Sequence, residues 1–176
     1  MGGKATKTEN KVSRATVAQL WQKELEPLLV EFCLRYELCG SYRRGKQEIG
    51  DVDIVIIPVM GGQIKMSNEA QALYDKIMVN NKRTHLIYDT LEGPIQVDIY
   101  IAEEADWGAQ ILTWTGSAHL NIMLRSSAKK MGFKLNQYGL WKNEQRFAGE
   151  TEREIFDAIG WSYLAPIERN KKFKER

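Results

Sequence analysis

Three aspartates have the type and spacing to do chemistry. Asp51 and Asp53 stand two residues apart at the start of Asp51–Pro58, a β-branched run that we predict to be a strand. Side chains two apart on a strand point to the same face. Asp98 lies in the middle of a later predicted strand, residues 95–102. If the two strands are neighbours in one sheet, the three carboxylates converge.

Such a cluster is unfavourable by itself, because two charges about 4 Å apart at an effective dielectric constant near 20 repel by roughly 4 kcal/mol. Divalent cations remove that cost, and hard cations prefer oxygen ligands. Two such ions can activate an attacking hydroxyl and neutralise a leaving pyrophosphate. A simpler interpretation stays open, since strand aspartates also cap turns or pair with arginine. For Asp98 taken alone we favour that simpler interpretation.

A phosphate-binding segment precedes the aspartate pair and favours the metal site. Nine residues separate Gly40-Ser41 from Asp51-Val52-Asp53, and the turn leads into a predicted short helix over residues 42–47. A Gly-Ser turn that opens a helix offers backbone N–H groups and a hydroxyl to a phosphate. Cationic donors are present at Arg43, Arg44 and Lys46. One turn-helix-strand unit would thus bring a triphosphate and metal ions together.

The elements that must position these residues form an α/β unit followed by a more helical one. In the first unit we expect a helix from Ser13 that Pro27 kinks or divides, a strand at 36–39, a helix at 68–80 and strands at 84–91 and 95–102. In the second we expect helices on both sides of Thr115-Gly116-Ser117, a hairpin of residues 133–135 and 139–141, and a helix from the capping box at Thr151 to about Gly160. The pattern predicts an α+β fold.

Composition limits the class of protein. The chain has 176 residues, of which 43% are hydrophobic and 27% charged, which suits one globular domain or two small lobes. No apolar run approaches the length of about 18 residues that a membrane helix needs, so we expect no membrane association. Cys33 and Cys39 fit neither a disulfide framework nor a zinc pattern, and no signal peptide is visible, so we expect an intracellular protein. The start Met1–Thr6 formally fits an acylation pattern, but we favour a simple polar tail.

The small net charge of +2 conceals an uneven distribution. Residues 1–106 carry 13 basic and 16 acidic side chains, a net charge of −3, whereas residues 107–176 carry 12 basic and 7 acidic side chains, a net charge of +5. The excess of carboxylates in the first part and of cations in the second suggests a carboxylate site beside a surface that prefers polyanions.

Several segments together carry a family resemblance. Residues 40–45 and 50–53, with a third aspartate on a later strand, resemble the nucleotidyltransferase signature of the DNA polymerase beta superfamily, specifically the family X DNA polymerases. Later segments resemble the thumb lobe of that family: Trp114–Asn121 with Arg125, Lys134–Leu140 and Ile155–Trp161. The resemblance covers residues 36–170 and implies a palm with a mixed β-sheet plus a small α+β thumb-like lobe.

The resemblance implies roles for individual residues. Asp51, Asp53 and Asp98 would be catalytic and would hold two Mg²⁺ ions, with Mn²⁺ as a substitute, and Asp98 would lie nearest the primer 3′-hydroxyl. The residues that would bind the triphosphate are Gly40, Ser41, Arg44 and Gly50. Those that would face the sugar of the nucleotide are Thr113, Trp114 and Gly116, and Asn121 would face its base. Those that would bind DNA are Arg125, on the minor-groove side of the template, and Lys129, Lys130 and Lys134; without the resemblance, these exposed charges would be only a solvated helix face. The tail Arg169–Arg176 is a second candidate DNA surface.

The implied activity is that of a minimal DNA-directed DNA polymerase that adds dNTPs to a primer 3′ end in short-gap repair. Its partners would be gapped or primer-template DNA and dNTPs, with a DNA ligase as a further candidate, and we expect a monomer. The implied division is a flexible tail over 1–13, a palm over 14–104 and a thumb-like domain over 105–176. Two alternatives are a template-independent nucleotidyltransferase acting on DNA, RNA or protein, and a DNA-end binding module without activity.

The sequence departs from the family pattern at three points. Too few residues precede the palm for the lyase and helix-hairpin-helix domains, so the chain resembles the minimal two-domain viral members and we expect no lyase activity. Thr113-Trp114 stands where templated members commonly have Tyr-Phe and template-independent members have Gly-Trp, which bears on sugar selectivity and template dependence. Gln96 stands where many relatives have arginine, so Asp98 would lack that partner.

Overall fold

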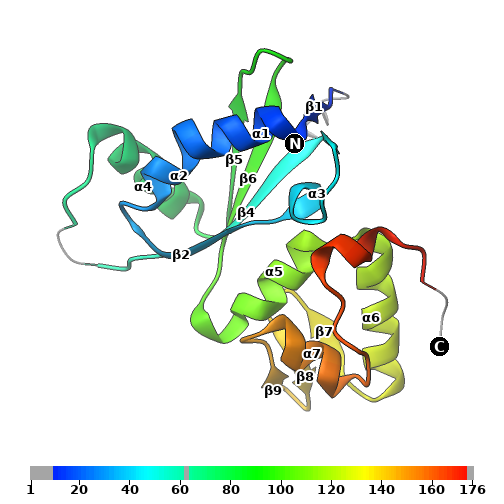
Figure 1. Ribbon diagram of the computed structural model, residues 1–176. Coiled ribbons are helices and arrows are strands. Elements are labelled where there is room, and N and C mark those ends of the chain that lie inside the picture. Colours follow the sequence, from blue (N-terminus) through cyan, green and yellow to red (C-terminus); the bar gives the residue numbers. More distant parts are fainter. Residues whose placement is uncertain (1–9, 62–63, 174–176) are drawn as a thin grey trace, which may run out of the picture.

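The structure is a computed structural model that describes residues 10–61 and 64–173. Its elements follow in the order β1 (Val12–Ser13), α1 (Arg14–Leu20), η1 (Trp21–Leu25), α2 (Glu26–Leu29), β2 (Cys33–Leu38), α3 (Gly40–Arg43), β3 (Glu48–Ile49), β4 (Asp51–Pro58), α4 (Asn68–Asn80), β5 (Arg83–Tyr88), β6 (Ile95–Ile101), η2 (Glu104–Asp106), α5 (Trp107–Thr115), α6 (Ala118–Lys130), β7 (Lys134–Asn136), β8 (Gly139–Lys142), β9 (Gln145–Ala148), α7 (Glu152–Ala158) and η3 (Pro166–Asn170). These elements form two lobes, with β2, β4, β5 and β6 in the first and α5–α7 with β7–β9 in the second (Figure 1). The α+β class predicted from the sequence is confirmed.

A four-stranded sheet in the order β2-β4-β6-β5 is the frame of the first lobe. The central strands β4 and β6 run parallel, and both flanking pairs are antiparallel. Alternate side chains of β4 and β6, such as Ile54 and Ile99, pack with α1, α2 and α4 in one core. The opposite face packs on α5 through Val55, Tyr100 and Ile111. The sheet therefore separates an apolar face from the face that carries the aspartates.

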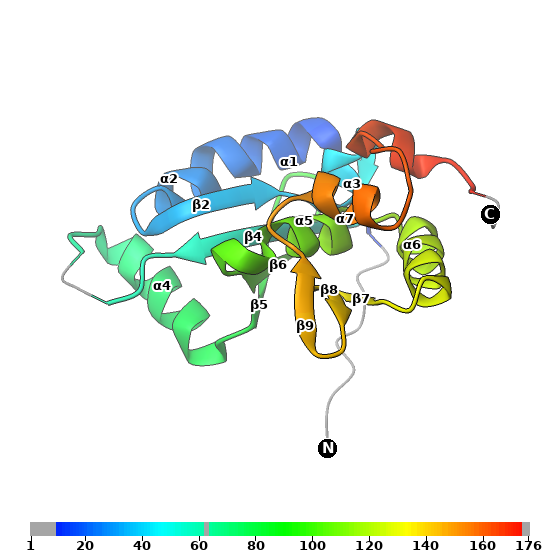
Figure 2. The ribbon, with the colours of Figure 1, turned by 90° about the horizontal axis from the view of Figure 1, so that it is seen from below.

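The second lobe has its own apolar core. Residues of α5, α6, α7 and the β7-β8-β9 sheet pack together, among them Leu112, Leu124, Leu140 and Phe156. Figure 2 shows this small sheet below α5 and α7. The cap predicted at Thr151 begins α7, where its side chain accepts the N–H of Glu154, and the Ser117 side chain accepts the N–H of Leu120 in the same way at the start of α6.

The division of the first helix at Pro27 is confirmed, because the proline stands in the first turn of the second short helix α2, where its missing N–H costs nothing, and the π-helical turn η1 joins α2 to α1. Two other local expectations are corrected. The short helix begins at Gly40 rather than Tyr42. Strand β9 was not predicted, because the turn before it uses Asn143 and Glu144 with positive φ rather than a glycine.

The predicted flexible tail over residues 1–13 lies mostly outside the described residues, as does the acylation pattern at the start of the chain. Its last part is ordered: Val12 is buried, and β1 pairs with β3 through Val12 and Ile49. Burial of that apolar side chain fixes the strand, so the tail prediction is wrong for Val12 and Ser13. Among helices of the described residues, none combines the length and apolarity that a membrane span requires.

Candidate active site

The sheet places the three predicted carboxylates on two adjacent strands. In the parallel register of β4 and β6, Asp53 lies opposite Asp98, and Asp51 lies opposite Gln96. The alternation predicted for β6 holds, because Val97 and Ile99 enter the core on the other face while Asp98 shares a face with Gln96 and Tyr100. Strands β4 and β6 are therefore neighbours, which is the condition under which the three aspartates were expected to converge.

Asp98 is almost fully buried, with 2% of the residue exposed, and its carboxylate is saturated with donors. Oδ1 accepts from His85 Nδ1 at 2.9 Å and Arg83 Nε at 3.3 Å, and Oδ2 accepts from Arg83 Nη2 at 2.7 Å and Gln96 Nε2 at 2.8 Å. Burial acts to raise the pKa of Asp98, but these hydrogen bonds outweigh it and hold the pKa below its usual value. The carboxylate is therefore an anion at neutral pH. The arginine partner is missing at position 96, as expected, and Arg83 on β5 is the cationic partner instead.

Asp53 has the opposite electrostatic environment. Burial, together with the negative charges of Asp51 and Asp98, raises its pKa to about 7. Its nearest donor is the Tyr100 hydroxyl, 3.4 Å from Oδ1. Burial is the largest cause of the raised pKa, and the Tyr100 hydrogen bond and the charge of Arg83, which act to lower it, do not offset burial and the two neighbouring carboxylates.

Within the described part of the chain, no three His, Cys, Asp or Glu side chains are arranged to hold a metal ion without rearrangement. The physical reason is visible at Asp98, whose oxygens turn to Arg83 and His85. The donor set nevertheless fits Mg²⁺, because it consists of carboxylate oxygens and because the charge around Asp53 is one that a divalent cation would offset.

The Gly40-Ser41 turn lies directly against the aspartates. Gly40 has φ of +62°, and a Cβ at that position would stand 2.5 Å from Asp53 Oδ2, so only glycine fits. The Ser41 hydroxyl is buried and has no hydrogen-bond partner among the described residues. A buried hydroxyl without a partner is uncommon and indicates a place for a ligand atom.

A small pocket of about 360 Å³ opens beside Ser41. Its lining residues are Lys11, Ser41, Lys46, Gln47, Glu48 and Gly50. Pairing of β1 with β3 brings Lys11 there, and it forms an ion pair with Glu48 at 3.6 Å. No local pattern indicates Lys11, which stands far from the Gly-Ser turn along the chain and reaches it only through β1.

Arg44 lies between the two lobes. Burial lowers its pKa, although the charges of Asp53 and Asp51 act in the opposite direction. Its guanidinium donates to the carbonyl oxygen of Thr115 and, through Nε at 3.0 Å, to Asn170 Oδ1. Arg44 thus stands close to the aspartates while it is held by the second lobe.

The residues predicted to face the nucleotide lie along α5 and the start of α6. The Trp114 ring stacks on Tyr100 with centroids 3.6 Å apart, and its Nε1 donates to Gln110. Asn121 donates to the carbonyl oxygen of Thr113 at 2.8 Å. A Cβ on Gly116 would stand 3.2 Å from Arg44 Nη1. These contacts bring Thr113, Gly116 and Asn121 to the end of α5 that faces Arg44, while Trp114 lies over the palm.

A large cleft of about 1030 Å³ separates the lobes next to this stack. Its lining residues include Arg83 and Tyr100 from the palm side and Trp114, Tyr138 and Trp141 from the other lobe. The cleft therefore begins at the residue that holds Asp98.

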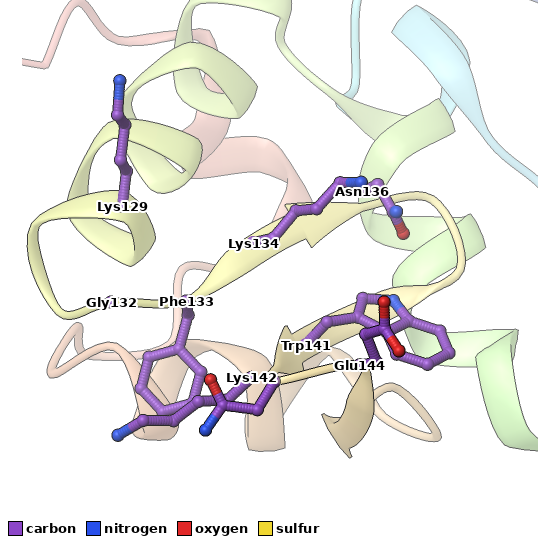
Figure 3. Close-up of a pocket in the computed structure, with 9 residues that line it drawn as sticks. Lys129, Gly132, Phe133, Lys134, Asn136, Trp141, Lys142 and Glu144 are labelled. Carbon is purple, nitrogen blue, oxygen red and sulfur yellow. The ribbon is translucent and has the colours of Figure 1, made fainter.

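The predicted basic surface is exposed and concave. Arg125, Lys129, Lys130 and Lys134 are all exposed. Lys129 and Lys134 line a pocket of about 570 Å³ together with Lys142, Phe133 and Trp141 (Figure 3). Sequence reasoning missed Lys142, which reaches this pocket because β8 pairs with β7.

The other candidate DNA surface, the tail Arg169–Arg176, is corrected at its first residue. Arg169 is fully buried and donates to Glu152 Oε1 at 2.6 Å. A guanidinium held in that way cannot contact DNA phosphate. Residues 174–176 lie outside the described part of the chain.

Comparison with known proteins agrees with this geometry. The family model of the DNA polymerase beta palm matches residues 7–136, and that of the DNA polymerase beta thumb matches residues 110–170. Repair DNA polymerase X of African swine fever virus is 30% identical over 136 residues, covering 74% of this chain and 78% of the viral protein.

Larger relatives match over a smaller share of their length. DNA polymerase lambda of Rattus norvegicus is 28% identical over 160 residues, covering 75% of this chain and 28% of the relative. DNA polymerase lambda of Arabidopsis thaliana is 28% identical over 163 residues, which cover 74% of this chain and 31% of the relative. Since the palm match alone spans well over half of the chain and includes all three aspartates, the chain belongs to the DNA polymerase beta family, the family X polymerases.

Proposed function

We propose that this protein is a DNA polymerase that adds dNTPs to a primer 3′ end during short-gap repair, with release of pyrophosphate. The observation that carries the proposal is the register of β4 and β6, which sets Asp53 opposite Asp98 beside the unpartnered Ser41 hydroxyl. The relatives named repair DNA polymerase X and DNA polymerase lambda support the same class of reaction.

In this proposal Asp51, Asp53 and Asp98 hold two Mg²⁺ ions, and Mn²⁺ can substitute. When bound, the ions would lower the pKa of the primer hydroxyl and neutralise charge on the triphosphate. The protein's own part is to keep Asp98 ionised and oriented, to concentrate negative charge around Asp53, and to leave room at Gly40 for the carboxylate. Asp98 would lie nearest the primer 3′-hydroxyl.

The triphosphate would bind along the Gly40-Ser41 turn. The Ser41 hydroxyl can donate to a phosphate oxygen, and Lys11 and Lys46 line the adjoining pocket with positive charge. Gly50 and Arg44 complete this side. The second lobe would contribute the sugar and base contacts through Thr113, Trp114, Gly116 and Asn121.

DNA would lie on the exposed cations of the second lobe. Arg125 would contact the template, and Lys129, Lys130 and Lys134 its phosphates, with Lys142 added by the structure. We propose the division into a palm over 14–104 and a thumb-like domain from 105, action as a monomer on gapped or primer-template DNA, and a DNA ligase as the partner that seals the product.

Primer extension on a one-nucleotide gap tests the proposal. Wild-type protein should extend the primer with the complementary dNTP and stop when EDTA is added. Asp53→Asn and Asp98→Asn should each lower the rate by about 100-fold or more, since a displaced or missing catalytic group costs at least that much. Asp89→Asn, which removes an exposed carboxylate beyond the end of β5, is the matched control and should extend normally.

Two results would refute it. Extension by Asp53→Asn at near the wild-type rate would exclude the carboxylate mechanism. Equal incorporation of all four dNTPs with and without a template would instead favour a template-independent nucleotidyltransferase.

A further inference from the structure

The strongest unassigned feature near the site is the set of side chains that hold Asp98. The neighbouring strand β5 supplies a cation: Arg83 forms a two-pronged contact, with Nη2 at 2.7 Å from Oδ2 and Nε at 3.3 Å from Oδ1. A planar guanidinium that meets both oxygens fixes the plane of the carboxylate as well as its charge.

His85 provides the second restraint. In the antiparallel register of β5 and β6, His85 lies directly opposite Asp98, and its Nδ1 is 2.9 Å from Oδ1. Because an ionised carboxylate only accepts hydrogen bonds, Nδ1 carries the proton and the tautomer is fixed. Arg83 and His85 stand two residues apart on β5, so both side chains reach the same face of the sheet.

This arrangement is not an ordinary surface ion pair. Surface pairs hold two mobile side chains in water and contribute little. Here the acceptor is 2% exposed and receives four hydrogen bonds from three residues, so its orientation is determined from both strands. The donors themselves are partly exposed, at 52% of the Arg83 side chain and 38% of that of His85, and they do not belong to the apolar core. Both side chains donate to the carboxylate, and the Arg83 guanidinium also lies over the Tyr100 ring, 5.5 Å from its centroid.

We infer that Arg83 and His85 are positioning residues that together orient the Asp98 carboxylate for the reaction. The inference rests on the proposed function. It concerns the orientation of Asp98 and not the binding of the triphosphate, which lies on the side of Ser41. Loss of either residue should therefore lower kcat while the KM for dNTP stays unchanged.

The test compares matched variants in gapped primer extension. Arg83→Ala and His85→Ala should each lower kcat by about 10-fold to 100-fold, the range typical of residues that orient a metal ligand. His85→Asn, whose amide can donate from a similar position, should retain more activity than His85→Ala. Lys82→Ala removes a neighbouring exposed cation that makes no contact with Asp98, so it should behave as wild type. Arg83→Ala leaves the buried Asp98 carboxylate without its counter-ion, so this variant should melt at a lower temperature than wild type, and all rates are compared below the melting temperature of every variant.

A second measurement does not depend on catalysis. Electron paramagnetic resonance titration with Mn²⁺, without DNA or dNTP, should show weaker binding in Arg83→Ala and His85→Ala by about 10-fold. Asp98→Asn, which removes the carboxylate charge itself, should show the largest loss of Mn²⁺ affinity. Lys82→Ala is again the control. Mn²⁺ affinity that is unchanged or tighter in both alanine variants would overturn the inference.

The kinetic outcomes also separate the inference from the function on which it rests. If kcat stays near the wild-type value in both alanine variants, or if Lys82→Ala loses as much as Arg83→Ala, the positioning role is wrong while the polymerase assignment stands. If wild-type protein extends no primer but binds Mn²⁺ through Asp98, the proposed function fails and the Mn²⁺ titration alone decides the role of Arg83 and His85. If Arg83→Ala does not fold, Arg83→Lys takes its place, and if His85→Ala does not fold, His85→Asn takes its place. Wild-type kcat in every variant that folds would also overturn the positioning role.

Discussion

At the scale of single residues, the site depends on two small residues, Gly40 and Ser41, as much as on its carboxylates. Gly40 allows the turn to pass against Asp53, and the Ser41 hydroxyl remains without a partner beside it. Gly40 keeps space beside the Asp53 carboxylate, and Ser41 keeps a free hydroxyl for the proposed triphosphate. Each can be removed by one substitution with a clear expected result.

Gly40→Ala should damage activity far more than Gly45→Ala. Both glycines have positive φ, of 62° and 78°, so both substitutions cost about 1 kcal/mol in backbone strain. Only at position 40 would the new Cβ collide with Asp53, at 2.5 Å from Oδ2, whereas at position 45 it meets Ile167 at an ordinary 3.5 Å. We expect a loss of extension rate about 100-fold greater for Gly40→Ala, measured with the melting temperature of both proteins. Equal rates in the two variants would show that Asp53 tolerates displacement.

Ser41→Ala should separate substrate binding from stability. Since the buried hydroxyl has no partner among the described residues, its removal should leave the free energy of unfolding unchanged or slightly raised. The KM for dNTP should rise about 10-fold, the effect of about 1.4 kcal/mol of lost hydrogen bonding. Steady-state extension and urea unfolding measure the two quantities. A drop in stability with an unchanged KM would mean that the hydroxyl is structural.

At the scale of elements, a buried ion network joins α3 to the second lobe. Glu152, at the start of α7, accepts from Arg43 at 3.0 and 3.1 Å and from Arg169 at 2.6 Å. Arg43 follows the Gly40-Ser41 turn on α3, and Arg169 belongs to η3, which both views place beside α3 (Figure 1, Figure 2). The turn that contacts Asp53 is therefore attached to the second lobe through one carboxylate.

Glu152→Gln should destabilise the protein by about 3 kcal/mol, because it leaves the buried guanidinium of Arg169 without its counter-ion and removes one of the two carboxylates that pair with Arg43, the other being Glu37 at 2.9 Å. Burial acts to raise the pKa of Glu152, but hydrogen bonds from Arg169 and Arg43 outweigh it and lower the pKa below its ordinary value of 4.5. A depressed folded-state pKa contributes stability above the unfolded-state value, and this contribution is lost as the pH falls through the folded-state pKa. The difference between wild type and Glu152→Gln should thus be complete near neutral pH and shrink below about pH 4.5.

Urea unfolding at several pH values measures this difference. Glu154→Gln, an exposed substitution on the same helix, is the control and should change stability by less than about 0.5 kcal/mol at every pH. A difference that did not vary with pH would show that Glu152 acts through packing rather than through its charge.

At the scale of the whole molecule, the uneven charge has a structural meaning. The part with an excess of acid carries the aspartates on its sheet, and the part with an excess of base carries the exposed cations of α6 and the groove with Lys134 and Lys142 (Figure 3). None of Lys129, Lys134 and Lys142 forms an ion pair with another residue of the described ranges. Such a surface suits the phosphate backbone of DNA.

Lys134→Gln with Lys142→Gln should make DNA binding less sensitive to salt. Each phosphate contact adds about 0.7 to 0.9 to the slope of log affinity against log salt, so the double variant should lower the slope by about 1.5. Lys23→Gln with Lys76→Gln removes two exposed cations from the other lobe and is the matched control. Fluorescence anisotropy with gapped DNA between low and moderate salt gives both slopes. Identical slopes for the two double variants would exclude the groove from the DNA surface.

Much of this protein follows from the sequence by itself. The β-branched run of β4 and the helix α4 have the bounds that local pattern predicts, because strand alternation and capping residues act over neighbouring positions. The types and spacing of Asp51, Asp53 and Asp98 likewise indicated the chemistry before any contact was known. The family was indicated by motifs in order along the chain, and the comparisons confirm it.

Only the tertiary structure decided which residues serve those aspartates. Arg83 and His85 reach Asp98 because β5 pairs with β6 in one register, Lys11 reaches Ser41 because β1 pairs with β3, and Arg169 is withdrawn from the surface by Glu152. Each of these contacts joins segments that no local pattern relates, and a shift of one residue in register would reverse the faces. The sequence therefore determined the chemistry that the site offers, and long-range strand pairing and burial determined how each carboxylate is held.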